Sequence, residues 1–164
     1  MIILSLGSNL GDREATLRAA VRDIGELDAV TVVGASALVE TAALKPTGVD
    51  SDAPAYLNAI VAVESSLSPL ELLEALRGIE HAHGRVRAER WGDRTLDIDI
   101  IAFDELTFQS RDLTVPHPRA AERAFVLAPW LELDPAAHLV GHGAVAELLE
   151  PLDRPTVFAA EALL

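Results

Sequence analysis

The stretch YLNAIVAVESSLSPLELLEALRGIEHAH, residues 56–83, contains a strand signal followed directly by a helix signal. Its first part, from Tyr56 to Val63, is a short apolar run with several β-branched residues, which predicts a strand. Residues 68–71 read Ser-Pro-Leu-Glu, which places serine at a helix N-cap, proline at the first helical position and glutamate at the capping-box position. We therefore predict a helix from residue 69 to about His83, ended by Gly84.

The flanking sequence repeats this alternation of strands and helices. The predicted elements are, in order, a strand over 2–6, a turn over 7–11, a helix from Asp12 to about Leu27, a strand over 30–40, a long loop over 41–54 and, after residue 84, a charged loop and a strand over 97–103. Shorter helices are expected over 119–132 and 143–149. The order βαββαβ is that of a ferredoxin-like α+β domain, with helices on one face of an antiparallel sheet.

Composition limits the classes of protein that the chain can belong to. Half of its 164 residues are apolar, which excludes a disordered chain and suits one packed domain over residues 1–164, in which we assign no role to 151–164. The net charge of −13 argues against a nucleic-acid partner, and no apolar run is long enough to span a membrane. The absence of cysteine fits a reducing cytoplasm, where we expect the protein to be located. We separately expect it to act on small molecules, as a monomer.

Basic residues are nevertheless concentrated in one part of this acidic chain. Seven of the thirteen lie between residues 85 and 123, namely Arg85, Arg87, Arg90, Arg94, Arg111, Arg119 and Arg123. Arginine binds phosphate oxygens through two parallel hydrogen bonds and stays charged at neutral pH. This concentration predicts a local site for an anion.

The strand over 97–103 begins with two aspartates in alternation. Side chains alternate along a strand, so Asp97 and Asp99 share one face while Ile98 and Ile100 enter the core on the other. Two carboxylates so close repel each other unless a cation or a shared proton relieves them, and Mg²⁺ takes one or two carboxylates together with water and substrate phosphates. Taken alone, such a pair is more often the solvated face of a half-exposed strand than a metal site. The arginine-rich loop before it favours phosphates held between arginine and metal.

Two common nucleotide-binding signatures are absent from the sequence. There is no Walker A pattern, and the only lysine is Lys45. A Gly-x-Gly-x-x-Gly fingerprint is also missing. Any nucleotide is therefore expected to bind through a different arrangement.

Several motifs, in a consistent order, resemble the hydroxymethyldihydropterin pyrophosphokinase family of folate biosynthesis. They are Ser5-Leu6-Gly7-Ser8-Asn9, Tyr56-Leu57-Asn58-Ala59, the run Arg90-Trp91-Gly92-Asp93-Arg94-Thr95-Leu96-Asp97-Ile98-Asp99, and Leu113-Thr114-Val115-Pro116-His117-Pro118 with Arg123-Ala124-Phe125-Val126-Leu127. The resemblance covers roughly residues 1–150. It implies transfer of pyrophosphate from ATP, as co-substrate with two Mg²⁺ ions, to 6-hydroxymethyl-7,8-dihydropterin, with release of AMP.

The resemblance also implies residue roles. Asp97 and Asp99 would hold both metal ions, and the catalytic group would further contain Arg85, Arg87, Trp91 and Arg94. Nucleotide contacts would come from Glu80, Arg85, Arg87, Arg94, Ile100, Leu113, Thr114, His117 and Arg123. The pterin would be bound by Thr41, Ala42, Leu44, Tyr56, Asn58, Trp91 and Phe125, with Tyr56 and Phe125 stacking on its faces and Asn58 donating and accepting at its edge.

The chain departs from the family pattern at a few positions. Asp93, Ala42 and Ala43 stand where prolines are frequent, and Asp112 stands where an arginine can contact the nucleotide. Two other functions stay open at this point. One is a Mg²⁺-dependent phosphotransferase with another acceptor, and the other is a ferredoxin-like regulatory module that binds a ligand without turnover.

Overall fold

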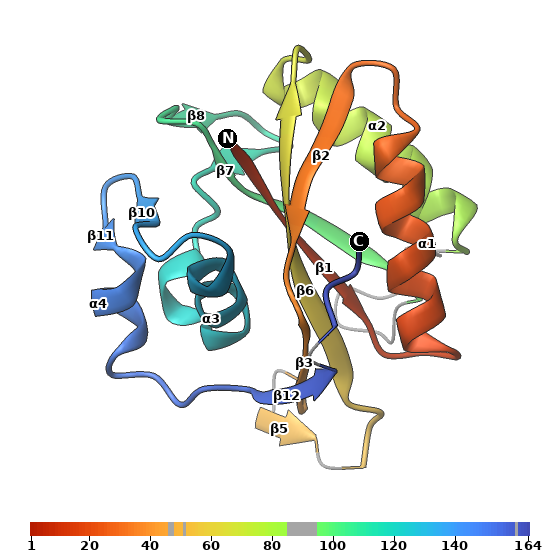
Figure 1. Cartoon of the computed structure of the whole chain (residues 1–164), viewed down its shortest axis with the longest axis vertical. Helices are drawn as coiled ribbons and strands as arrows, with labels where there is room; N and C mark the ends of the chain where they lie inside the picture. Colours follow the sequence, from red (N-terminus) through yellow and green to blue (C-terminus); the bar gives the residue numbers. More distant parts are fainter. Residues whose placement is uncertain (46–47, 51, 85–94, 160) are drawn as a thin grey trace.

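A six-stranded antiparallel sheet forms the centre of the protein in the computed structural model, which describes residues 1–164 apart from 46–47, 51, 85–94 and 160 (Figure 1). Its strands are β1 (Ile2–Ser8), β2 (Val30–Ala35), β3 (Leu38–Thr41), β6 (Tyr56–Ser65), β7 (Asp97–Phe103) and β12 (Thr156–Ala159). The order is β12-β3-β6-β1-β7, and β2 also pairs with β6. Strand β7 therefore lies at one end of the sheet and β1 beside it.

The α+β class and the antiparallel sheet predicted from the sequence are confirmed, while the ferredoxin-like label stays a prediction. The predicted strand over 30–40 is divided at Ser36 and Ala37 into β2 and β3. The Ser36 hydroxyl accepts from the Ile60 amide at 2.9 Å and donates to the Ala37 carbonyl at 2.8 Å. A side chain thus replaces part of the strand ladder at this point.

Helices α1 (Arg13–Gly25) and α2 (Pro69–Ala82) cover one face of the sheet (Figure 1). Each begins at the predicted cap. The Asp12 carboxylate accepts from the Ala15 amide at 3.1 Å, and Ser68 and Glu71 form the complete capping box. The apolar sides of these helices, with the fully buried Leu17, Ile24 and Leu72, pack on one set of alternating strand residues, among them Leu4, Leu6, Leu57 and Val63.

The other face is covered in part by α3 (Ala124–Leu133), α4 (Val145–Leu149) and the short 3-10 helix η1 (Ala120–Glu122). They bury the opposite set of strand residues, among them Ile3, Ile60 and Ile101. The sequence predicted helices on one face, and the structure places helices on both. The expected helix over 119–132 is interrupted at Arg123, whose backbone is extended at φ −108° and ψ 98°.

Several short elements were not predicted. The predicted loop over 41–54 contains the paired strands β4 (Ala43–Lys45) and β5 (Gly48–Asp50). Two further strand pairs are formed by β8 (Phe108–Gln109) with β9 (Thr114–Val115), and by β10 (His138–Leu139) with β11 (Gly143–Ala144).

The segment 151–164, left without a role by the sequence, contributes β12 to the sheet. It then returns to α1, where the Arg18 guanidinium donates to the Ala162 carbonyl at 3.2 Å and Leu163 is buried. In the part of the chain that the structure describes, no helix is both long and apolar enough to cross a membrane.

Candidate active site

Three strands bring a carboxylate, a glycine and an amide side chain into one row across the sheet. In the register, Asp97 of β7 pairs with Gly7 of β1, which pairs with Asn58 of β6. Register partners on neighbouring strands point to the same face, so these residues share the face that carries α3. Neighbouring strands lie about 4.8 Å apart, which puts Asp97 and Asn58 on the order of 10 Å from each other.

Gly7 leaves room for the Asn58 side chain beside the central strand. A β-carbon built at this position would lie 3.1 Å from the Asn58 Oδ1 atom and 3.7 Å from the Tyr56 Cδ1 atom. The first of these distances is tighter than ordinary van der Waals contact, so Asn58 would have to move. The glycine therefore permits the present position of Asn58 beside the central strand.

The acidic pair lies next to Arg123 and His117, which come from the segment after β9. Asp97 and Asp99 are half-buried and lie on one face of β7, as predicted. The Asp99 Oδ2 atom is 3.7 Å from Arg123 Nη1 and 3.9 Å from His117 Nε2. Burial lowers the pKa of Arg123 from its ordinary value while Asp99 acts in the opposite direction. The guanidinium remains the main positive charge beside Asp99.

His117 is neutral at pH 7. Burial, followed by the nearby Arg123, lowers its pKa from 6.5 to about 4, against the opposing effect of Asp97. Its Nδ1 atom accepts from the Arg119 amide at 3.1 Å, so the hydrogen of the neutral ring is assigned to Nε2, which faces Asp99. His117 therefore presents a donor next to the acidic pair.

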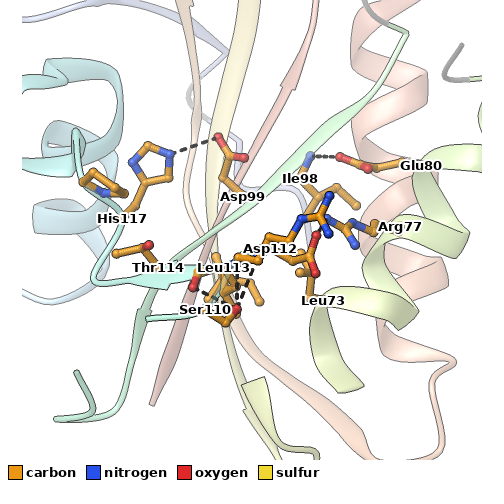
Figure 2. Close-up of a pocket in the computed structure, with 13 residues that line it drawn as sticks. Leu73, Arg77, Glu80, Ile98, Asp99, Ser110, Asp112, Leu113, Thr114 and His117 are labelled. Atoms are coloured by element: carbon orange, nitrogen blue, oxygen red, sulfur yellow. Dashed lines mark hydrogen bonds and ion pairs between the residues drawn. The ribbon is translucent and has the colours of Figure 1, made fainter. Parts of the chain in front are cut away.

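Glu80 is a buried carboxylate on the opposite side of β7. It is 3% exposed, and its Oε1 atom accepts from the Ile98 amide at 2.8 Å. Ile98 lies between the two aspartates in the sequence, so this bond fixes the backbone that carries them. The sequence analysis predicted that Glu80 contacts the nucleotide, and this stays a prediction. The structure shows in addition that Glu80 links α2 to β7 through its bond to the Ile98 amide (Figure 2).

A cavity of about 300 Å³ lies along the outer edge of β7, between α2 and the segment 110–118. Six residues predicted to contact the nucleotide or the metal line it: Glu80, Asp99, Ile100, Leu113, Thr114 and His117. Figure 2 shows Asp99 and His117 directed toward each other at one end of the cavity and Arg77 near Asp112 at another part. The cavity thus joins the predicted nucleotide residues to the acidic pair.

The sequence did not predict Arg77 or Ser110 as lining residues, while Arg111, which also lines the cavity, was one of the arginines of the predicted anion site. The Ser110 hydroxyl accepts from the amides of Asp112 and Leu113 at 3.3 and 3.1 Å, which shapes the turn at the cavity wall. Arg77 Nη2 lies 4.0 Å from Asp112 Oδ1. The spacing of Arg77 three residues before Glu80, on one helix face, was the signal that could have placed it there.

The residues predicted to bind the pterin fall into two groups. Thr41, Tyr56 and Asn58 lie together where β3 pairs with β6, and the Asn58 amide donates to Thr41 Oγ1 at 2.9 Å. Phe125 comes from the first turn of α3, half-buried, with the Arg123 guanidinium 5.7 Å from its ring centroid. Ala42 is exposed next to β3, and Leu44 belongs to β4.

Four predicted catalytic residues, Arg85, Arg87, Trp91 and Arg94, lie outside the described residues, as do Arg90 and Asp93. Their roles stay predictions. Among the residues that the structure describes, no group of three or more His, Cys, Asp or Glu side chains is arranged to hold a metal ion. The pair Asp97 and Asp99 is the smaller set that Mg²⁺ uses when phosphates complete its coordination.

A family model described as "7,8-dihydro-6-hydroxymethylpterin-pyrophosphokinase (HPPK)" matches residues 3–135. The predicted class, a pyrophosphokinase, is thereby confirmed. The chain belongs to the HPPK family. A Bacillus subtilis 2-amino-4-hydroxy-6-hydroxymethyldihydropteridine pyrophosphokinase is 46% identical over 130 residues, covering 79% of this chain and 75% of that protein. The protein of the same name from Methylorubrum extorquens is 41% identical and covers 92% of both chains.

Solved structures agree on the fold. A crystal structure of a Plasmodium falciparum HPPK-DHPS triple mutant with STZ-DHP has a TM-score of 0.69 at 16% identity and covers 92% of this chain. The chain spans 42% of the length of that protein. A structure described as HPPK-DHPS in complex with substrates gives a TM-score of 0.67 at 13% identity.

Proposed function

We propose that the row Asp97–Gly7–Asn58 is the reaction centre of a pyrophosphokinase that joins ATP and 6-hydroxymethyl-7,8-dihydropterin across strand β1. The observation that carries this proposal is the register of β7, β1 and β6. It puts the acidic pair and the Asn58 amide on one face with only a glycine between them. A phosphate bound at Asp97 and a ring bound at Asn58 are then neighbours.

The nucleotide occupies the cavity at the edge of β7. Its walls offer apolar contacts from Leu73, Ile100 and Leu113, which suit the faces of a base. The cavity ends at Asp99 and His117, so the triphosphate leads from the base toward the acidic pair. His117 Nε2–H and the Arg123 guanidinium stand there as hydrogen-bond donors for phosphate oxygens.

Asp97 and Asp99 fit Mg²⁺ by number, charge and placement. Mg²⁺ binds through one or two carboxylates plus substrate phosphates, and this pair is half-exposed beside the cavity. When bound, two Mg²⁺ ions would neutralise charge on the phosphates and help align them for in-line attack. The nearby Arg123 guanidinium also reduces the repulsion between the carboxylates.

The pterin lies against the end of β3 and β6. Asn58 carries a donor and an acceptor on one side chain, and Tyr56 adds an aromatic ring next to it. Phe125 of α3 is the second aromatic side chain of this half. The backbone around Thr41 and Ala42 would supply further hydrogen bonds.

The reaction follows from this arrangement. The hydroxymethyl oxygen forms a bond to the β-phosphorus of ATP, and the bond from that phosphorus to the α,β-bridging oxygen breaks. AMP leaves with both electrons of the broken bond, and the hydroxyl proton is released. Arg85, Arg87, Trp91 and Arg94 would assist from the loop before β7, as the family resemblance implies. We further propose that the protein acts in the cytoplasm as a monomer and that residues 1–164 form one domain.

The proposal is tested by measuring AMP release from ATP and Mg²⁺, with and without 6-hydroxymethyl-7,8-dihydropterin. We expect pterin-dependent AMP from the wild-type protein and its loss in Asp97→Ala. Asp28→Ala is the matched control, because Asp28 is an exposed aspartate in the turn after α1. No AMP from folded wild-type protein would contradict the proposal and favour a ligand-binding module. AMP that depends on a different acceptor would favour another phosphotransferase.

A further inference from the structure

Arg13 connects β3, β12 and the residue before β6, from the side of the sheet that lies opposite the proposed active site. It is the first residue of α1, and its side chain is 23% exposed. The Nη1 atom donates to the Ala55 carbonyl at 2.6 Å and to Glu40 Oε2 at 3.0 Å. The guanidinium carbon lies 5.5 Å from the ring centroid of Phe158. The β1–α1 turn, β3 and β12 all lie at the lower end of Figure 1.

The two residues that accept hydrogen bonds from Arg13 each precede a residue that is predicted to bind the pterin. Glu40 precedes Thr41 on β3, and Ala55 immediately precedes Tyr56 at the start of β6. Thr41 and Tyr56 are register partners. Because side chains alternate along a strand, Glu40 faces α1 while Thr41 faces the proposed site. From the α1 side of the sheet, Arg13 therefore holds the two strand ends whose side chains are predicted to bind the pterin.

Neighbouring strands also hold these strand ends, since β12 pairs with β3 at Glu40 and β1 pairs with β6 at Leu57 and Asn58. β3 and β6 pair over only three residues, from Val39↔Asn58 to Thr41↔Tyr56. Ends of strands open more easily than their centres. A second contact, from the Asn9 side-chain amide to the Pro54 carbonyl at 3.4 Å, comes from the β1–α1 turn just before Arg13. The turn that follows Gly7 thus binds the segment before Tyr56 at two neighbouring carbonyls.

The chemistry of the contact suits a positioning role. Arginine can donate to a carbonyl and a carboxylate at the same time, and bonds to charged partners are stronger than neutral ones. Lysine provides fewer donors in a less fixed geometry. The Phe158 ring adds a cation–π contact from the C-terminal strand β12, which pairs with β3. This also gives a role to part of the segment 151–164.

We propose that Arg13 is a positioning residue for the pterin half of the site, acting through Glu40 and Ala55 on Thr41, Tyr56 and Asn58. This inference rests on the proposed function for the identity of the ligand. It adds that loss of Arg13 affects binding of the pterin and not of the nucleotide. Arg13 touches neither the cavity at β7 nor the acidic pair, so nucleotide binding should not depend on it.

The test compares the KM values for the two substrates in Arg13→Ala, Arg13→Lys and Arg22→Ala. Arg22 is an exposed arginine near the other end of α1, so its removal is the matched change in charge. In Arg13→Ala we expect KM for the pterin to rise about tenfold, because the loss of one charged hydrogen-bond pair weakens binding by about tenfold. KM for ATP and kcat should stay within about twofold of the wild-type values. Arg13→Lys should recover part of the pterin affinity, and Arg22→Ala should match the wild type.

A second measurement keeps the inference testable if Arg13→Ala is unstable or inactive. Amide hydrogen exchange at Thr41, Tyr56 and Leu57 should speed up in Arg13→Ala, and exchange at Ile98 to Ile100 should not. Unchanged pterin affinity in folded Arg13→Ala, or equal losses for both substrates together with uniform faster exchange, would overturn the positioning role. If the wild-type protein released no pterin-dependent AMP, the proposed function would be refuted. The exchange pattern would still show whether Arg13 stabilises the strand ends next to Glu40 and Ala55.

Discussion

The two faces of the central sheet differ in how completely helices cover them. On one face, α1 and α2 pack over apolar residues such as Leu4, Leu6 and Val63, which are inaccessible to solvent. On the other, α3 and α4 cover the part around Ile3 and Ile101. The row Asp97–Gly7–Asn58 lies beyond this second core. The same strands thus supply both a core and the residues of the proposed reaction centre.

This difference teaches where substitutions should act. A strand residue that faces α1 and α2 is surrounded by apolar side chains, so its truncation leaves a cavity. The row Asp97–Gly7–Asn58, on the face that α3 and α4 leave partly uncovered, has a half-buried carboxylate at Asp97 and a buried amide at Asn58 that bonds to Thr41. We expect substitution of the carboxylate to affect substrates rather than folding. The following predictions test this separation of stability from function.

The largest expected effect is on catalysis, from the uncovered face. In Asp97→Asn, kcat/KM should fall roughly 10³-fold, because the lost carboxylate removes several kcal/mol of metal-mediated stabilisation of the phosphates. The free energy of unfolding, measured by urea denaturation, should change by less than about 1 kcal/mol. A large loss of stability with activity retained per folded molecule would contradict this assignment of the face.

The next effect is on stability, from the covered face. Ile24 of α1 is fully buried against the sheet. Ile24→Ala should reduce the free energy of unfolding by about 2–5 kcal/mol, through lost burial and a residual cavity. At a temperature where the variant is folded, both KM values should match those of the wild type. An altered pterin KM in this variant would show that the two faces are not independent.

Gly7→Ala should affect one substrate. Its β-carbon would meet Asn58 Oδ1 at 3.1 Å, so we expect KM for the pterin to rise about tenfold and KM for ATP to change little. Gly34→Ala on β2 is the matched control, since a β-carbon there meets only Leu133 at an ordinary 3.7 Å. Equal behaviour of the two variants would argue against a pterin beside Gly7.

The smallest effect concerns pH and His117. The unfolded chain binds a proton on this histidine near pH 6.5 and the folded chain only near pH 4, because burial lowers the pKa. Stability of the metal-free and nucleotide-free protein should therefore decrease as the pH falls from 6.5 toward 4, by about 2 kcal/mol at most between pH 7 and 5. The decrease should be smaller in His117→Gln than in a control variant of the exposed His138.

Much of the fold was predictable from local sequence signals. The capping box at Ser68 and the alternation at Asp97 to Ile100 gave the right elements and the right faces, because both patterns act over a few residues. The strand β12 was missed, since a four-residue edge strand has little signal of its own and is formed by pairing with β3. The covering of the second face by α3 and α4 likewise depends on distant contacts.

The candidate site was predictable as a set of residues and not as an arrangement. The family resemblance predicted Asp97 and Asn58 as site residues and included Gly7 in a motif, but only the strand register shows that the three lie in one row. Arg77 is set apart in the sequence only by its spacing from Glu80, and Arg13 carries no motif that separates it from surface arginines. Their placement follows from tertiary neighbours, Asp112 for Arg77 and Glu40 with Ala55 for Arg13.

The most direct test of the central claim, that both substrates meet on the uncovered face, is an amide NMR spectrum. It would be recorded with Mg²⁺, a non-hydrolysable ATP analogue and 6-hydroxymethyl-7,8-dihydropterin. The account predicts that the largest shift changes in the described residues fall on Gly7, Thr41, Asn58, Asp97 to Ile100 and His117. Changes concentrated on the outer surface of α1 and α2, with these residues unaffected, would contradict it.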